Sequence, residues 1–517
     1  MMVALAGCQK DFSELEIDPN RPVHVPASLV LQEIQYNMYS NTGRPFSAEM
    51  RWNQFYCSNY NYYSTNEYTW SEMPNHFFTL KNVVKMEEEA LRSGAKEVNP
   101  YSALGKFFRA FFYDQMTKRV GDLPLEEALK GTDNFQPTYS SQKEIYKQIL
   151  TWLDESNDEL ASLIAAGENT IAGDIYYGGN LSQWQKAVNA FQLRVLTTLS
   201  EKSSDSELNV KGRFAAILSN SAKYPLMSSS GESLRFICNN NNKYPSNPDN
   251  FGFDATRQNM SKAYIDPLKL RNDPRLFRTA EPAGSALKAG KLASDFGAYE
   301  GASSGEDLAD MSFKAGVSNG TEFAPGQYSF QSRSRYYTNY VGEPVNIVGF
   351  EEMCFNIAEG IHRGWASGSA ESWYKKGIES SFGLYNIVDG TNTFTYSKTG
   401  GKNESDFRTF TYDFDLNSYL SQADVAYTAD QKGLEQIITQ KYLASFMNSG
   451  MEAYFNWRRT GYPKFYTGVG TGNSGRIAVR WIYPLSERTT NADNYEAAIN
   501  GQFNGDDNIN QPIWLIK

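Results

Sequence analysis

The sequence predicts a mainly α-helical fold that carries loop-rich segments and a few short strands. Apolar residues recur at helical spacing in five stretches, whereas runs with the period of two that marks a strand are short and few. Between residues 226 and 344 the residues Gly, Ser, Asn and Pro become dense and the apolar periodicity weakens. We therefore expect helices to form the scaffold and the loop-rich segments to decorate it.

The first helical stretch runs from Tyr101 to Val120, and Gly121 and Pro124 supply its stop. The second begins after Ser141, which forms a capping-box pattern with Glu144. The other three stretches are Trp184 to Val195, Phe350 to Ile361 and Leu434 to Tyr442. Short polar connections between such helices indicate antiparallel pairs of the tetratricopeptide type, although the chain has no clean 34-residue repeat.

We divide the chain into a short leader, a tether and one large domain. The leader is residues 1–8, the tether is the proline-punctuated stretch 9–26, and the domain is 27–517. Within the domain the helical scaffold lies mainly in 27–225, 345–385 and 425–460, and the loop-rich segments are 226–344, 386–424 and 461–517. The best strand candidate is Arg476 to Tyr483.

Composition and charge exclude several functions. The formal charge of −10 and the absence of a long Lys/Arg run argue against nucleic-acid binding, which depends on neutralising phosphates. No stretch approaches the roughly 18 consecutive apolar residues of a membrane-spanning helix. In contrast, 33 Tyr, 31 Phe and 9 Trp are an unusually large aromatic share, so we expect some of these rings to face a ligand.

The N-terminus indicates export. Leu5-Ala6-Gly7-Cys8 matches the bacterial lipobox, in which the cysteine becomes the lipid-carrying first residue of the mature protein, and polar residues follow at once. The basic start and most of the apolar core of a signal are missing from this sequence. The alternative is a plain N-terminus with an incidental cysteine.

Catalytic and metal motifs are weak. Gly301 to Gly305 fits the G-x-S-x-G pattern and Gly470 to Gly475 fits G-x-G-x-x-G, but neither lies between a strand and a helix, and we interpret both as turns. The three histidines are scattered, and the other three cysteines are widely spaced without a C-x-x-C pair, so we expect no metal, disulfide framework or cofactor. Paired carboxylates remain open, because sequence spacing cannot reveal them.

Several segments, in order along the chain, resemble those of the SusD/RagB family, and especially its SusD-like lipoprotein branch. The segments are 18–22 (DPNRP), 25–29 (VPASL), 174–178 (DIYYG), 184–194 (WQKAVNAFQLR), 273–276 (DPRL), 358–359 (AE), 440–442 (QKY), 457–463 (WRRTGYP) and 480–487 (RWIYPLSE). No single segment is strong, but their common order over more than 450 residues makes coincidence implausible.

The resemblance implies a SusD-like scaffold of four tetratricopeptide-like helix pairs in a non-enzymatic, cell-surface lipoprotein. Such a protein is anchored in the outer membrane through Cys8 and passes captured oligosaccharides to a SusC-like TonB-dependent transporter. Some relatives take peptides, so a peptide ligand is an alternative. A surface glycan hydrolase with an unrecognised carboxylate pair is a further one.

We expect the ligand to bind where aromatic and amide side chains gather outside the helices. Residues 51–78 supply Asn53, Tyr60, Tyr62, Trp70 and Asn75, a combination that offers sugars both stacking surface and hydrogen bonds. We expect Trp70 to be exposed on a loop, although any one of these rings could instead belong to the core. The residues expected to form a second platform are Arg335, Tyr336 and Tyr337.

Overall fold

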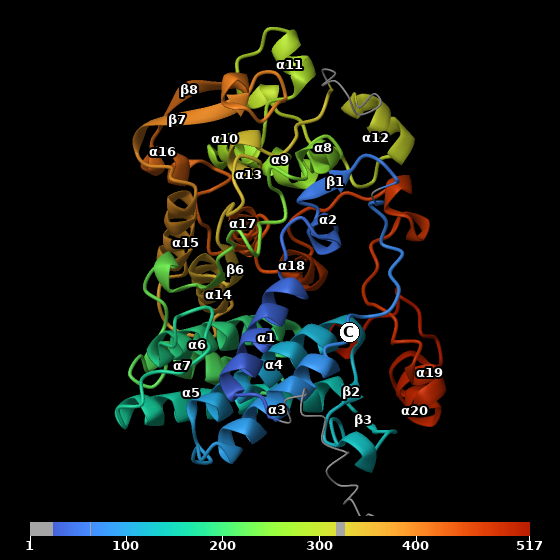
Figure 1. The fold of residues 1–517 in the computed structure, drawn as a ribbon. Helices are drawn as coiled ribbons and strands as arrows, with labels where there is room; N and C mark the ends of the chain where they lie inside the picture. The colour runs from blue at the N-terminus through green and yellow to red at the C-terminus, as the bar shows by residue number, and fades with distance from the viewer. Residues whose placement is uncertain (1–23, 63, 317–325) are drawn as a thin grey trace, which may run out of the picture.

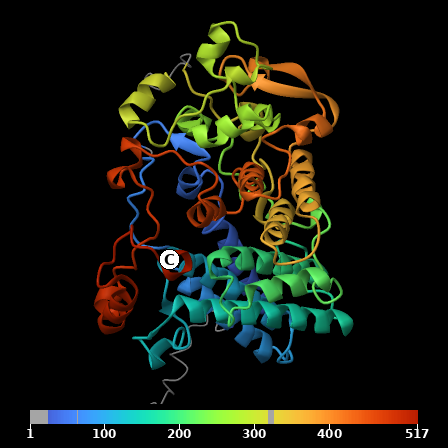
Figure 2. The same cartoon turned by 180° about the vertical axis from the view of Figure 1, so that it is seen from behind.

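A computed structural model describes residues 24–62, 64–316 and 326–517 (Figure 1). Helices dominate it, which confirms the mainly helical class predicted from the sequence. Long helices form the lower part of the molecule in Figure 1, while short helices, loops and the longest hairpin form the upper part. Figure 2 shows the same two parts from behind. Cys8 and most of the tether lie outside the described residues.

Four helix pairs build the scaffold, and each pair packs on the next. Contacts join α1 to α3, α4 to α5, α6 to α7 and α14 to α15 within the pairs, and α3 to α4, α5 to α6 and α6 to α14 between them. The eight helices are α1 (Ala27–Ser40), α3 (Phe77–Arg92), α4 (Pro100–Val120), α5 (Gln142–Ala165), α6 (Leu181–Thr198), α7 (Val210–Ser219), α14 (Phe350–His362) and α15 (Ala370–Leu384).

All five predicted helical stretches are helices, namely α4, α5, α6, α14 and α17 (Gln431–Ala444). Helix α4 begins at a capping box between Asn99 and Ser102, and it ends at Gly121, whose φ of 99° favours glycine. Ser141 caps α5 by accepting a hydrogen bond from the backbone N–H of Glu144. Periodicity and capping residues therefore located these helices correctly.

Shorter helices complete the fold. They are α2 (Ala48–Trp52), α8 (Phe251–Asp254), α9 (Lys262–Leu270), α10 (Arg275–Thr279), α11 (Gly284–Lys288), α12 (Leu308–Ala315), α13 (Arg333–Tyr336), α16 (Leu416–Ser421), α18 (Glu452–Thr460), α19 (Glu487–Thr490) and α20 (Ala492–Phe503). Many fall in segments for which the sequence shows only loops, because single-turn helices are too short to give an apolar period.

The strands form antiparallel pairs. They are β1 (Tyr56–Ser58) with β5 (Gln258–Met260), β2 (Leu123–Pro124) with β3 (Tyr139–Ser140), β4 (Leu234–Phe236) with β6 (Val345–Val348), and β7 (Gly390–Ser397) with β8 (Phe407–Phe414). The β7–β8 hairpin lies in a segment that we expected to be loop-rich. Its alternating Thr and aromatic residues are the strand signal that the sequence analysis missed.

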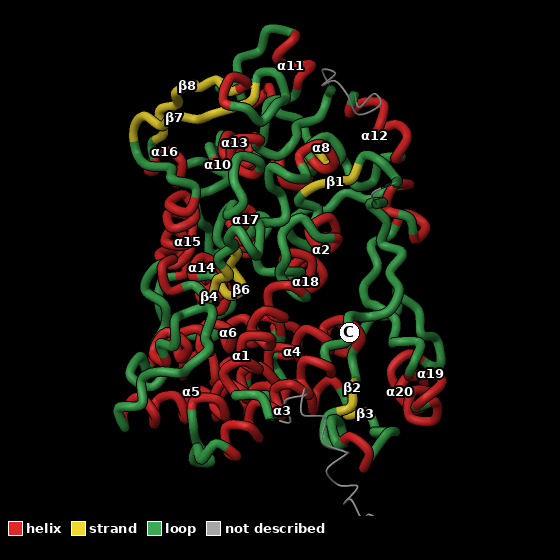
Figure 3. Tube along the Cα trace, in the orientation of Figure 1, coloured by secondary structure: helices red, strands yellow, loops and turns green. Residues whose placement is uncertain are grey.

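The strand predicted at Arg476 to Tyr483 is wrong. Its backbone N–H groups donate to three different places: Val479 to Ile509, Trp481 to Arg119, and Ile482 to Ser71. No continuous ladder can form when neighbouring residues pair with separate segments. The stretch instead runs beside residues 68–73. Figure 1 shows the blue N-terminal and the red C-terminal segments side by side at the edge of the molecule, and Figure 3 draws both as loops.

Buried ion pairs tie the scaffold helices together. The ammonium group of Lys118 on α4 lies 2.7 Å from Asp114 and 2.6 Å from Glu452 on α18, and all three side chains are almost fully buried. Arg194 on α6 pairs with Glu352 on α14 at 2.5 Å in the same way. Charges removed from water need such partners, so these pairs fix which helices lie against each other.

Within the described ranges, no helix is both long enough and apolar enough to cross a membrane. The same residues contain no cluster of three or more His, Cys, Asp or Glu that could hold a metal ion.

Candidate ligand-binding surface

The loop after β1 carries the most exposed tyrosines of the predicted site. Backbone pairing of β1 with β5 holds Tyr56 against Met260 and Ser58 against Gln258. The side chain of Asn66 then accepts a hydrogen bond from the backbone N–H of Ser58 and donates one to its carbonyl, both at 2.8 Å. The loop is thereby fixed at its base, and a fixed loop presents side chains with little entropic cost on binding.

Two rings on this loop face outward together. Tyr62 is 80% exposed and Tyr60 is 42% exposed, and their ring centroids are 6.5 Å apart with planes tilted by 37°. The guanidinium of Arg257 lies 4.6 Å from the centroid of the Tyr60 ring. We call these three side chains the tyrosine platform. Exposed rings beside a hydrogen-bonding cation can stack on the apolar face of a sugar and bind its hydroxyl groups.

The loop is also held from below. Asn59 donates to the carbonyl of Thr256 at 3.1 Å and to the side-chain oxygen of Asn259 at 2.6 Å. The hydroxyl of Ser312, on α12, donates to the carbonyl of Asn59. Two segments far away in sequence, 256–259 and α12, therefore determine where Tyr60 and Tyr62 stand.

The expectation that Trp70 is an exposed platform ring is wrong. Trp70 does lie outside the helices and strands, as predicted, but it is only 6% exposed. Its ring stacks on Trp481 with centroids 3.6 Å apart, and it meets Trp52 and Tyr454 edge to face. The C-terminal segment covers this ring, and nothing near Trp70 in the sequence reveals that cover.

Asn53, Tyr336 and Tyr337 are buried as well, which contradicts their expected exposure. Asn53 donates to the carbonyl of Gly450 at 2.7 Å and accepts from the backbone N–H of Tyr454 at 2.9 Å. Such hydrogen bonds satisfy the amide inside the core. Tyr336 and Tyr337 are both 0% exposed, because the single-turn helix α13 turns them inward against other rings.

Arg335 and Asn75 are accessible to solvent, but neither belongs to the tyrosine platform. Arg335 forms an ion pair with Glu343 at 2.5 Å, and the side chain of Arg335 is 21% exposed to solvent. Asn75 is exposed and accepts a hydrogen bond from the backbone N–H of Phe77 at the start of α3. It lines a surface pocket of about 520 Å³ formed with Phe77, Phe78, Lys81, Leu129 and Gly131. Figure 1 places α3 in the lower part and β1 in the upper part, so the predicted residues do not form one site.

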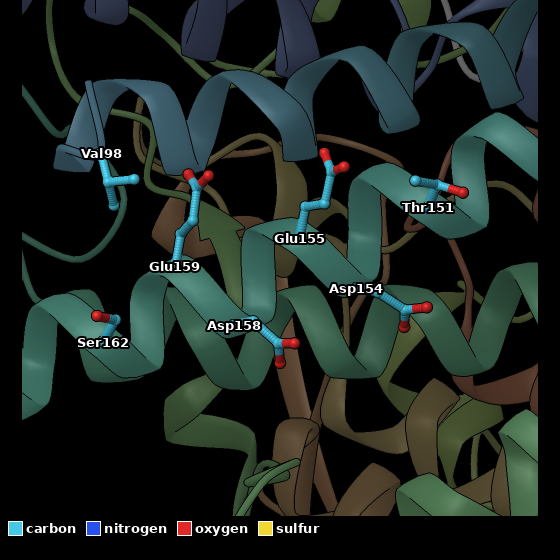
Figure 4. A pocket seen from close by; sticks show the side chains of 7 residues that line it. All are labelled: Val98, Thr151, Asp154, Glu155, Asp158, Glu159 and Ser162. Carbon is cyan, nitrogen blue, oxygen red and sulfur yellow. The ribbon is translucent and has the colours of Figure 1, made fainter.

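An acidic pocket on α5 does not suit a sugar. It measures about 420 Å³ and is lined by Val98, Thr151, Asp154, Glu155, Asp158, Glu159 and Ser162. Figure 4 shows Glu155 and Glu159 pointing to one side of the helix and Asp154 and Asp158 to the other. Lys106 holds Glu159 at 2.8 Å, while Arg213 and Lys223 pair with the two aspartates. The pocket offers no aromatic ring for stacking.

The two glycine-rich patterns have no catalytic setting. Gly301 to Gly305 forms a turn and a single bridge rather than a strand-to-helix elbow, and Gly470 to Gly475 lies in short 3₁₀ turns. The interpretation of both as turns is confirmed. Arg257, which belongs to the tyrosine platform, was missed because a lone arginine in a polar stretch gives no sequence signal.

Comparison with known proteins identifies relatives that share this fold. A family model described as starch-binding associating with outer membrane matches residues 19–484. A SusD homologue from Bacteroides fragilis matches with a TM-score of 0.80 and 29% identity, covering 95% of this chain and 100% of its own. An outer-membrane protein from Bacteroides vulgatus, to which a role in nutrient binding is ascribed, has a TM-score of 0.78, 30% identity and coverage of 95% and 100%.

A chitin-binding SusD homologue from Flavobacterium johnsoniae shares the fold, with a TM-score of 0.68, 20% identity and coverage of 95% and 98%. None of the curated proteins matches this chain. The family model spans most of the sequence, and the four stacked helix pairs agree with it. The chain therefore belongs to the SusD-like family of outer-membrane nutrient-binding proteins.

Proposed function

We propose that this protein captures oligosaccharides at the cell surface through the tyrosine platform. The observation that carries this proposal is the pair of exposed rings, Tyr60 and Tyr62, on a loop whose base is hydrogen-bonded on both sides. The family description names starch, and the relative from Flavobacterium johnsoniae is chitin-binding, which supports a glycan as the ligand. Asn75 and Arg335 are accessible enough to contribute separate contacts.

Calorimetry with the Tyr60→Ala and Tyr62→Ala variants tests the platform once a glycan array has identified a ligand. Each substitution should weaken binding about tenfold or more, because a stacked ring contributes on the order of 1–1.5 kcal/mol beyond the area that it buries. Phe135→Ala is a matched control, since Phe135 is 73% exposed but lies between α4 and α5. Unchanged affinity in both tyrosine variants would remove the platform from the proposal.

A peptide ligand is the alternative within the same family. Exposed tyrosines beside a guanidinium also suit peptides, because the rings stack on side chains and the cation binds carbonyl oxygens or carboxylates. A peptide panel measured beside the glycan array separates the two ligands. Binding of peptides alone would replace the oligosaccharide in the proposal and leave the platform in place.

We propose further that the protein is a binding protein rather than a glycan hydrolase. Three of the four carboxylates of the α5 pocket, Glu159, Asp154 and Asp158, pair with Lys106, Arg213 and Lys223, which leaves Glu155 without a second free carboxylate to act as the acid and nucleophile of a glycosidase. Incubation with the bound glycan should release no new reducing ends. Steady release that survives further purification would establish the hydrolase instead.

We propose that the protein is held on the outer membrane by a lipid anchor. There it delivers its ligand to a SusC-like TonB-dependent transporter. The lipobox at Cys8 supports a lipid anchor, and several acyl chains hold a protein on a membrane far more firmly than one. With a complete signal in front, Cys8→Ser should release soluble protein from cells that lack the transporter. Cells that carry the transporter should retain part of it, and co-purification with a β-barrel protein would identify the partner.

A further inference from the structure

Among the residues that the structure describes, one fully buried arginine forms no ion pair. Arg119, Arg275, Arg333 and Arg480 are all 0% exposed. Three of them contact a carboxylate: Arg119 meets Glu49 at 2.7 Å, Arg275 meets Asp273 at 2.6 Å and Arg480 meets Asp507 at 2.5 Å. Within the part of the chain that the structure describes, Arg333 has no carboxylate within ion-pair distance.

The hydrogen bonds of Arg333 are also incomplete. Its Nη1 donates to the carbonyl of Gln331 at 3.2 Å and its Nε to the carbonyl of Gly400 at 3.4 Å, while Nη2 has no partner among the described residues. The rings of Phe330, Phe251 and Tyr337 lie around the guanidinium at 4.8, 5.8 and 5.9 Å. Burial lowers the pKa of Arg333, as expected for a cation that lacks compensation.

Two buried hydroxyl groups beside it lack partners too. Ser246 and Tyr337 are 0% exposed, and neither hydroxyl makes a hydrogen bond to any residue that the structure describes. The guanidinium carbon of Arg333 lies 5.9 Å from the centroid of the Tyr337 ring. Burial raises the pKa of Tyr337, whereas the charge of Arg333 and a contact with the Ser246 hydroxyl act to lower it. Arg333, Tyr337 and Ser246 therefore bring polar groups with unused hydrogen-bonding capacity into one buried region, and such groups cost free energy when they are left unpaired.

The charge of Glu281 acts on Arg333, but its carboxyl forms no ion pair with the guanidinium. Its two oxygens accept hydrogen bonds from the backbone N–H groups of Arg333 at 2.5 Å and Ser397 at 2.7 Å, so both are directed at the backbone. Burial raises its pKa to about 7, which leaves it partly neutral near neutral pH. The nearby cation of Lys402 lies 5.4 Å from the Phe251 ring and adds positive charge to the region.

We propose that a small monovalent anion of the chloride class binds between Nη2 of Arg333 and the hydroxyls of Tyr337 and Ser246. A water molecule could satisfy the hydroxyls, but it would leave the buried guanidinium without an ion-pair partner. A divalent phosphate would exceed the single positive charge of Arg333 and leave excess charge in an apolar surrounding. A monovalent anion balances the charge and accepts all three donors.

The site would stabilise the base of the tyrosine platform. Phe330 pairs with Asn259, and Asn259 pairs with Cys57 in the β1–β5 ladder that leads to Tyr60. The anion would thus fix the segment containing Arg333, and through it the two strands below the platform. This role does not depend on which ligand the platform binds.

Bromide replaces chloride and can be located by anomalous diffraction, so crystals of the protein soaked in sodium bromide test the site directly. We expect an anomalous peak in contact with Nη2 of Arg333 and the two hydroxyls. An ordered oxygen at this place without anomalous signal would show that water fills it, and bromide confined to surface lysines would show an adventitious ion only. Either result would overturn the proposal.

Thermal unfolding in sodium chloride and in sodium gluconate of equal ionic strength provides a second test. Chloride should raise the melting temperature saturably, by about 2 °C for a chain of this size at a hundredfold excess over its dissociation constant. Tyr337→Phe and Ser246→Ala should reduce this shift. Tyr336→Phe is the matched control, because its buried hydroxyl also lacks a partner among the described residues but lies near Glu343 and Arg335.

Arg333→Gln should abolish the chloride shift if the variant folds. If it does not fold, the two hydroxyl variants decide the matter, because each removes one small group. Equal melting temperatures in the two salts for the unmodified protein would refute the proposal, and so would a chloride shift that Tyr337→Phe and Ser246→Ala leave unchanged.

Discussion

Replacing Trp70 with alanine should destabilise the protein and leave the platform able to bind. The ring is 6% exposed and contacts Trp481, Trp52 and Tyr454, so its removal leaves a cavity among aromatic side chains. Truncation of a buried tryptophan costs about 3–5 kcal/mol. For 517 residues the unfolding entropy is on the order of 1 kcal/mol per kelvin, so the melting temperature should fall by about 3–5 °C.

Differential scanning calorimetry measures this shift, and Tyr62→Ala is the matched control. Because Tyr62 is 80% exposed, its loss should change the free energy of unfolding by about 0.5 kcal/mol or less. Titration of both variants with the ligand completes the comparison. If Trp70→Ala kept the original melting temperature and lost binding, Trp70 would not be a core residue, because an exposed ring that stacks on the ligand is expected to give that result.

Three further predictions concern buried polar groups. Glu452→Gln should cost up to about 3 kcal/mol in urea unfolding, since it removes one of the two carboxylates that pair with Lys118, and an unchanged midpoint would contradict the role of this ion pair. Burial raises the folded pKa of Glu281 to about 7, so this group stabilises the protein fully only below its unfolded pKa near 4.5. Its contribution to the free energy of unfolding should be lost as the pH rises to 7. Glu281→Gln should flatten the dependence of stability on pH in this window. Burial lowers the pKa of His76 to about 3, so its contribution should be lost as pH falls below about 6.5, and a variant without the imidazole should not show this loss.

The scaffold could be predicted from the sequence because its signals are local. Apolar residues recur every three or four positions in α4, α5, α6, α14 and α17, and the residues that cap α4 and α5 adjoin them in the chain. The β7–β8 hairpin was missed although its alternation is also local. Its residues alternate between threonine and aromatic side chains, and the surrounding Gly and Ser gave the segment the composition of a loop.

The candidate binding surface could be predicted only in part, because exposure depends on distant segments. Tyr60, Tyr62 and Trp70 share one polar, asparagine-rich stretch, yet the first two face outward and the third is covered by Trp481. The covering residue lies more than 400 positions away. No pattern within residues 51–78 distinguishes a ring that another segment will cover from one that stays open.

The pairing of residues 68–73 with 471–482 also constrains how the chain can be made. Synthesis is directional, so Trp481, which stacks on Trp70, and Ile482, which pairs with Met73, emerge only after more than nine-tenths of the sequence has been completed. Contacts of such large sequence separation form late, because a long loop must close before they form. The early part of the chain therefore cannot reach its final packing before the C-terminal segment arrives, and a truncation that removes residues 471–517 should leave an aromatic cluster around Trp70 open to water.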